Sequence, residues 1–230
     1  MSRFAVSLLA LFAFLSAASA QTGRAFVRAS GEGVVSIRPD QVRISIGVTT
    51  TANTAQESGD QNTAQVNAVL AALRQLLGPN ADIRTVSYSV TPNYRFPQGG
   101  GIPTLLGYTT NNTVAVISAD LSVAGKVIDA ATQAGATTIQ GLSFGLRDPE
   151  PARSQALRAA TMQARAHAEA IALGLGVRLG ATVSAEEASA VRTTTLALDG
   201  RAAGATTTPI EAGNLEVRAT VVIEAQIAAQ

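Results

Sequence analysis

The 230-residue chain carries 17 basic and 16 acidic residues, and 47% of its residues are hydrophobic. Arg3 is the only charged residue among the first twenty, so the rest of the chain is neutral and lacks the Lys and Arg excess typical of nucleic-acid binding. The absence of cysteine excludes disulfides, thiol chemistry and thiolate metal sites.

The first twenty residues have the three parts of a secretory signal peptide. A short basic start, residues 1–3, precedes an apolar run from Phe4 to Leu15, and Ala18-Ser19-Ala20 forms a small-residue cleavage site. The apolar run is too short to span a bilayer as a helix. We therefore expect residues 1–20 to be removed on export and residues 21–230 to form the mature protein.

Two strands are predicted next, at residues 26–37 and around the alternating apolar residues Val42, Ile44, Ile46 and Val48. The first contains Gly31-Glu32-Gly33, which resembles the start of a dinucleotide-binding loop. A third glycine and a following helix are missing, and Glu32 would repel a phosphate. We interpret the glycines as a bulge or bend in the strand, and Glu32 as a candidate subunit contact. Arg38-Pro39-Asp40 is predicted to be a turn leading into a hairpin.

A helix and two more strands are expected in the middle of the chain. Thr54 and Glu57 form a capping box, and the helix ends at Gly78-Pro79. The apolar residues at helical spacing are Val66, Leu70, Leu73 and Leu77. Residues 83–91 and 107–119 are predicted strands. The glycine-rich residues 94–103 between them are predicted to be a long flexible hairpin tip.

A second helix is predicted to be capped by Ser122 and ended by Gly135. A strand follows, with Leu142, Phe144 and Leu146 alternating. The third helix is expected to run from Asp148 to about Leu175. Alanine recurs at every fourth position along it, at Ala152, Ala156, Ala160, Ala164 and Ala168. Such a stripe of small residues allows a helix to lie close to a sheet or to another helix.

The end of the chain is predicted to hold a strand at residues 182–191, a low-complexity mobile loop at residues 192–213, and a last strand from Leu215 to Ile227. The resulting order, β-β-α-β-β-α-β-α-β-β, favours an α+β fold with a mostly antiparallel sheet. No linker divides the mature chain, so one domain is the simplest interpretation, with two subdomains as the alternative.

The residues give no positive evidence of catalysis. His167 is the only histidine and lies within the alanine-rich helix, where a surface or partly packed position is expected. The adjacent Glu186 and Glu187 point to opposite faces of a strand, and Asp148 and Glu150 suit a helix N-terminus. Other polar candidates are a chance glycosylation sequon at Asn111 and the scattered Arg158, Arg165 and Arg178. We predict no catalytic, cofactor-binding or metal-binding residue and identify no small-molecule substrate.

The chain resembles the SIMPL-domain family of secreted or periplasmic proteins of unknown function. The matching residues are spread over residues 26–227, and their order carries the resemblance. They are Gly31-Glu32-Gly33, Pro39-Asp40, Asn62, Arg84-Thr85, Val90 to Tyr94, Gly107-Tyr108, Asn111, Asp120-Leu121, Gly135-Ala136, Phe144, Ala152-Arg153 to Ala168, and Pro209 to Gly213.

The resemblance implies an α+β fold, a periplasmic or outer-membrane-facing location, and large ring-like or channel-like homo-oligomers in some members. It also implies a loose link to oxidative-stress tolerance and supplies no agreed catalytic motif. We therefore expect an exported, non-enzymatic cell-envelope protein that self-assembles, with peripheral outer-membrane association. The alternative is a periplasmic binding module that captures a peptide or envelope partner through a strand edge or residues 94–103.

Overall fold

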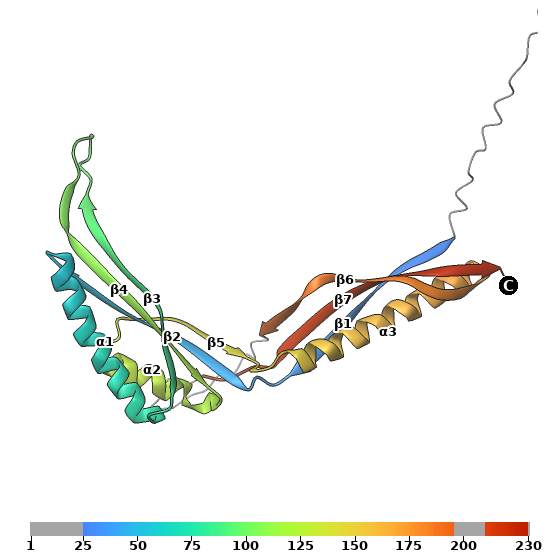
Figure 1. Ribbon diagram of the computed structural model, residues 1–230, viewed down its shortest axis with the longest axis horizontal. Coiled ribbons are helices and arrows are strands. Elements are labelled where there is room, and N and C mark those ends of the chain that lie inside the picture. The colour runs from blue at the N-terminus through green and yellow to red at the C-terminus, as the bar shows by residue number, and fades with distance from the viewer. Residues whose placement is uncertain (1–24, 196–209, 230) are drawn as a thin grey trace, which may run out of the picture.

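A computed structural model describes residues 25–195 and 210–229. The predicted signal peptide and most of the predicted loop at residues 192–213 lie outside the described residues. The described chain forms two lobes, each a sheet with helices on one face, which are joined at an angle into an elongated molecule (Figure 1). No helix among the described residues has the length and apolarity that a membrane crossing requires.

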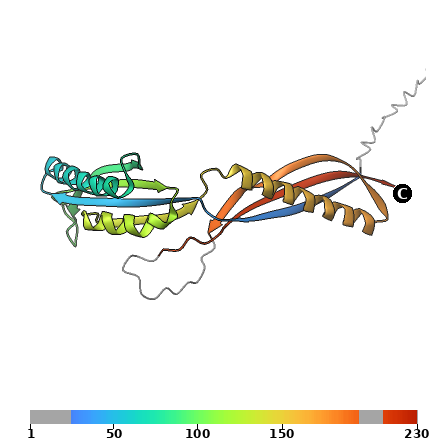
Figure 2. The ribbon, with the colours of Figure 1, turned by 90° about the horizontal axis from the view of Figure 1, so that it is seen from below.

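The first lobe is a four-stranded antiparallel sheet with strand order β3-β4-β2-β5. Its strands are β2 (Gln41–Ala52), β3 (Asp82–Arg95), β4 (Thr104–Ser118) and β5 (Thr138–Gly145). Helices α1 (Ala55–Leu77) and α2 (Ala124–Gln133) pack against one face (Figure 2). The alternating apolar residues of β2 are buried there, against Val69 and Leu73 of α1 and Val127 of α2.

The second lobe is a three-stranded antiparallel sheet with strand order β1-β7-β6. Its strands are β1 (Phe26–Ile37), β6 (Val177–Thr195) and β7 (Leu215–Ala229). Helix α3 (Glu150–Gly174) lies along one face of this sheet (Figures 1 and 2). The predicted alanine stripe of α3 is fully buried against the odd-numbered apolar residues of β7.

The two glycines of β1 explain how α3 lies so close to the sheet. A Cβ atom at Gly31 would overlap the backbone of Ala160 and Ala164, and one at Gly33 would overlap the backbone of Ala156. Strand β1 pairs with β7 from end to end with no register shift. The predicted bulge at these glycines is therefore wrong, and their role is to make room for a helix backbone beside the strand.

The fold class and the order of elements agree with the sequence prediction. The predicted hairpin after Arg38-Pro39-Asp40 is wrong, because β1 and β2 belong to different sheets and this segment crosses between the lobes. The chain crosses again at residues 146–149 and 210–214. Leu146 packs against the core of the three-stranded sheet, and Ile210 packs against the core of the four-stranded sheet.

Other boundaries differ locally from the prediction. Asp120 rather than Ser122 caps the second helical segment, which begins with the 3-10 helix Leu121–Val123. Strand β6 continues to Thr195, so the start of the predicted mobile loop is strand. Strands β3 and β4 are longer than predicted and leave residues 96–103 as the hairpin turn.

Candidate functional site

Glu32 projects from the side of β1 opposite α3, and its surroundings are not those of a phosphate loop. Its carboxylate lies 2.9 Å from Nη1 of Arg218, whose Nη2 lies 2.5 Å from Oε2 of Glu216. The hydrogen bonds to these two carboxylates raise the pKa of the Arg218 guanidinium, and the bond to Glu32 is the larger cause. The backbone N–H of Glu32 donates to Oε1 of Gln163 at 2.6 Å. The Glu32 carboxylate is therefore paired with Arg218 within the chain, and its predicted role as a subunit contact stays a prediction.

His167 lies on the exposed side of α3, as predicted from its position in the helix. Its Nδ1 atom lies 2.7 Å from the carbonyl oxygen of Ser30. Because a carbonyl only accepts, the ring nitrogen donates this bond and ties α3 to β1.

The carboxylates singled out in the sequence also lie in structural pairs. Both carboxylate oxygens of Glu187 lie 3.2 Å from Nη2 of Arg153, while Glu186 points to the other face of β6. Asp148 accepts the backbone N–H of Glu150 at 3.0 Å at the start of α3. The described residues contain no group of three His, Asp or Glu side chains that could hold a metal ion.

A polar cluster inside the first lobe was not predicted. Ser58 and Asn62 of α1 and Thr110 of β4 are completely buried. The Asn62 amide donates to the carbonyl oxygens of Val48 and Thr110 at 3.0 and 3.3 Å, and the Ser58 and Thr110 hydroxyls lie 2.8 Å apart. The cluster fixes α1 on the sheet. The sequence signal that could have indicated it is the position of Ser58 and Asn62 on the helix face that also carries Val66, Val69 and Leu73.

Asn111 lies on the face of the four-stranded sheet that no helix covers. Its Oδ1 atom accepts a hydrogen bond from the Thr49 hydroxyl at 2.8 Å. The same face carries a contact of 3.1 Å between the hydroxyls of Thr51 and Thr109, and Asn93 donates to Thr109 at 2.7 Å. The hydroxyl and amide groups of this face therefore largely satisfy one another.

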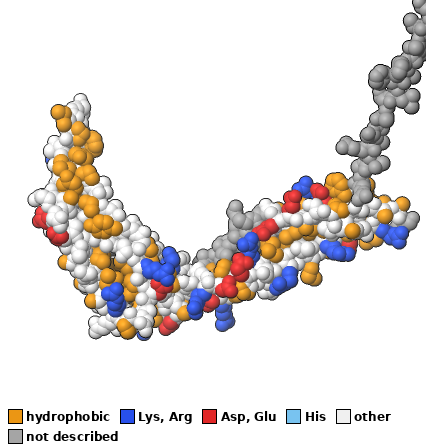
Figure 3. Space-filling view, in the orientation of Figure 1, with side chains coloured by type: hydrophobic (Ala, Val, Ile, Leu, Met, Phe, Trp, Pro, Cys, Tyr) orange, Lys and Arg blue, Asp and Glu red, His pale blue; other side chains and the backbone are white. Residues whose placement is uncertain are grey.

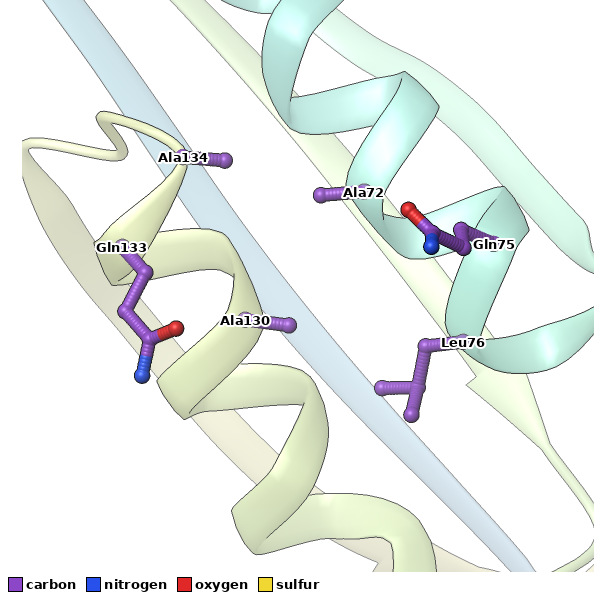
Figure 4. A pocket seen from close by; sticks show the side chains of 6 residues that line it. All are labelled: Ala72, Gln75, Leu76, Ala130, Gln133 and Ala134. Atoms are coloured by element: carbon purple, nitrogen blue, oxygen red, sulfur yellow. The ribbon is translucent and has the colours of Figure 1, made fainter.

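A hollow of about 530 Å³ lies between the two helices of the first lobe (Figure 4). It is lined by Ala72, Gln75, Leu76, Ala130, Gln133 and Ala134. Its walls are alanine methyl groups, one leucine and two neutral amides, as the close view shows. Without a titratable group in its lining, this hollow offers no acid–base or nucleophilic chemistry.

The β3–β4 hairpin is the most apolar exposed feature of the described chain. Its projecting end carries apolar side chains in water, and Figure 3 shows them gathered along the arm that holds β3 and β4. The most exposed are Phe96 at 72% and Ile102 at 89%. The sequence indicated a flexible tip here, but not that the flanking strands would also lie exposed. This hairpin is the candidate interaction surface.

Comparisons with known proteins find a family and relatives that match most of this chain. The family model SIMPL, described as "Protein of unknown function (DUF541)", matches residues 27–225. The "26 kDa periplasmic immunogenic protein" of Brucella melitensis is 27% identical over 187 residues, which cover 80% of this chain and 75% of the relative. The "Uncharacterized protein YggE" of Escherichia coli K12 is 30% identical over 158 residues, which cover 67% of this chain and 62% of the relative. The family match begins in β1 and ends in β7, so it includes both sheets, and the chain belongs to the SIMPL family.

Proposed function

We propose that this chain is an exported, non-enzymatic protein of the periplasm that self-assembles into a homo-oligomer and supports the tolerance of the cell envelope to stress, including oxidative stress. We include peripheral association with the outer membrane in this proposal. The Brucella relative is named a periplasmic protein, and the first twenty residues of this chain have the pattern of a signal peptide. The names of the relatives reported above denote no enzyme.

The observation that carries the proposal of self-assembly is the exposure of large apolar side chains on the outer face of α3. Met162 is 74% exposed and Leu173 is 72% exposed. They are eleven positions apart, close to three helical turns, so both lie on the helix side away from the buried alanine stripe. Exposed apolar residues aligned along one helix face are typical of a protein contact.

This face of α3 and the β3–β4 hairpin lie at opposite ends of the elongated chain, so a subunit contact through α3 leaves the hairpin free (Figure 1). If this face of α3 contacts a different surface of the next copy, the interface is heterologous. Such interfaces produce closed rings when the rotation closes and filaments when it does not. The resemblance to ring-forming SIMPL proteins favours the closed form.

Light scattering of the mature chain, residues 21–230, tests self-assembly directly. We expect an oligomer at micromolar concentration, and a shift toward smaller species for Met162→Ser combined with Leu173→Ser. The matched control is Gln155→Ser, which changes a polar residue one heptad before Met162 on the same exposed line. A wild-type chain that is strictly monomeric at this concentration would contradict the proposal.

A second candidate is a binding module that uses β3 or residues 94–103. It is favoured by the position of β3 at the edge of its sheet, which leaves one side of the strand without a neighbouring strand. Replacing residues 96–103 with an Asn-Gly turn separates the two candidates. A binding module loses its captured partner and keeps its oligomeric state, whereas a hairpin needed for assembly loses the oligomer.

A further inference from the structure

We propose that the end of the β3–β4 hairpin, residues 94–106, is a lipid anchor that inserts its apolar side chains into the surface of a bilayer. This segment is called the hairpin tip below. The inference rests on the proposed location at the cell envelope. It is separate from the proposed self-assembly, for which the apolar face of α3 is available.

The hairpin tip is held away from the rest of the lobe. Strand β4 pairs with β2 only from Tyr108 onward, where Tyr108 faces Ala52. Beyond that point the two strands of the hairpin pair only with each other, Tyr94 with Leu105 and Arg95 with Thr104. The tip therefore projects beyond the first turn of α1 as a two-stranded ribbon that can reach into a surface (Figure 1).

The side chains of the tip are those that favour the boundary between lipid and water. Phe96 and Ile102 are 72% and 89% exposed, and Tyr94, Leu105 and Leu106 are each close to half exposed. A tyrosine ring at such a boundary places its apolar body in the lipid and its hydroxyl in the water, and a phenylalanine ring is wholly apolar. Insertion removes from water a set of apolar groups that the fold of this chain leaves uncovered.

The charge of the hairpin suits an anionic bilayer. Residues 83–119 contain no Asp or Glu, and their only charged residues are Arg84 and Arg95. Arg95 is part of the tip, whereas the acidic Asp60 of α1 lies near Tyr88, outside the tip. An arginine beside inserted apolar side chains can remain at the level of the lipid phosphates.

Two features of the hairpin favour lipid over strand pairing with another chain. The free edge of β3 is interrupted by Pro92, which has no N–H to donate, and by a register shift at Val86. The turn itself contains three consecutive glycines, Gly99 to Gly101, all with positive φ. Three glycines without side chains offer a protein partner little to recognise. Insertion into a lipid surface does not require shape complementarity between side chains.

Vesicle flotation of the mature chain tests the proposal, with vesicles of phosphatidylethanolamine and phosphatidylglycerol compared with vesicles of phosphatidylcholine. We expect wild type to float with both and more strongly with the anionic vesicles. Phe96→Ser combined with Ile102→Ser should bind at least about tenfold more weakly, because two fully inserted side chains are lost. The control is Phe26→Ser combined with Val183→Ser, which removes exposed apolar groups from the three-stranded sheet, outside both the tip and the exposed face of α3.

A second readout does not depend on a loss of binding. The chain contains no tryptophan, so Phe96→Trp introduces a single fluorophore at the tip. Its emission should shift to shorter wavelength with vesicles if the tip inserts. The proposal is overturned if wild type does not float, if the tip variant floats like wild type, if both double variants lose binding equally, or if the Phe96→Trp emission does not move. It is also overturned if the tip variant loses only the oligomer in light scattering, which would assign the tip to a second copy of the chain.

Discussion

Gly33 of β1 lies so close to Ala156 of α3 that a Cβ atom on residue 33 would overlap the Ala156 carbonyl oxygen. The helix backbone cannot move away without pulling its buried alanine stripe off the sheet. We therefore expect Gly33→Ala to lower the free energy of unfolding by about 3 kcal/mol, at the upper end of overpacking costs. Urea denaturation of the mature chain, followed by circular dichroism, measures this change.

The control for this prediction is Gly145→Ala at the end of β5. A Cβ atom at Gly145 meets nothing within 4 Å, and its φ is not positive. The same chemical change there should alter the unfolding free energy by less than about 1 kcal/mol. Equal effects at the two positions would show that strand propensity, rather than the contact with α3, causes the change in unfolding free energy for Gly33→Ala.

Asn62→Ala should also destabilise the first lobe, because the buried amide bonds two carbonyl oxygens from different strands. The loss leaves the carbonyls of Val48 and Thr110 without this donor in a closed interior. We expect a decrease of about 2 kcal/mol in the free energy of unfolding, within the range for buried polar groups that lose a partner. Urea denaturation provides the measurement.

Thr63→Ala is the neighbouring control for Asn62. The Thr63 hydroxyl bonds the carbonyl oxygen of Gly59 within the exposed side of α1. Its removal should change the unfolding free energy by no more than about 0.5 kcal/mol. A cost at Asn62 as small as that at Thr63 would mean that the buried polar cluster does not hold α1 on the sheet.

The parts of the fold that were predicted correctly are those in which the burial pattern is local. Strands β2 and β7 alternate along the sequence because one face of each is buried, and the spacing of the alanines in α3 shows its buried side directly. Pairing between strands is not local. The sequence after Arg38 indicates a turn, but nothing within that segment shows that β1 and β2 enter different sheets.

The glycines of β1 and the polar cluster on α1 show why contacts between distant segments were missed. Gly31 and Gly33 indicate an unusual strand, but their purpose is visible only when α3, more than one hundred residues later, lies across them. Asn62 stands out in the sequence only through the family resemblance, because its two acceptors belong to strands β2 and β4. The exposed hairpin was predicted in part, because its glycines mark the turn, while the strand ends beside the turn, at Tyr94 and at Leu105-Leu106, are not buried.

The cap at Asp120 predicts a dependence of stability on pH. Ser122 donates its hydroxyl to Oδ1 of Asp120 at 2.7 Å and its backbone N–H at 3.0 Å, and these bonds lower the pKa of the carboxyl. A carboxyl with a lowered pKa in the folded state stabilises the fold above its unfolded pKa, and this contribution is lost as pH falls through the folded value. Asp120→Ala should therefore have a lower thermal midpoint than wild type at neutral pH.

The difference between wild type and Asp120→Ala should shrink as the solution is acidified below the ordinary aspartate pKa of 3.8. Asp120→Asn is the informative companion, because it keeps an oxygen acceptor for Ser122 and removes the charge. Thermal unfolding of the three proteins between neutral and strongly acidic pH gives the comparison. A deficit in Asp120→Ala that stays constant over this range would argue against the charged cap.

Asp40 is expected to control the angle between the two lobes more than their stability. Its side chain accepts the backbone N–H of Arg147 at 2.7 Å, which ties together two of the segments that cross between the sheets. Asp40→Ala removes this tie, so the distribution of distances between the lobes should broaden.

The chain has no cysteine, so spin labels at Ala64→Cys on α1 and Met162→Cys on α3 report that distribution by pulsed electron paramagnetic resonance. Asp82→Ala breaks an ion pair to Arg84 that stays within β3, and it should leave the distribution unchanged. A distribution for Asp40→Ala as narrow as that of wild type would mean that packing of the crossing segments alone fixes the angle.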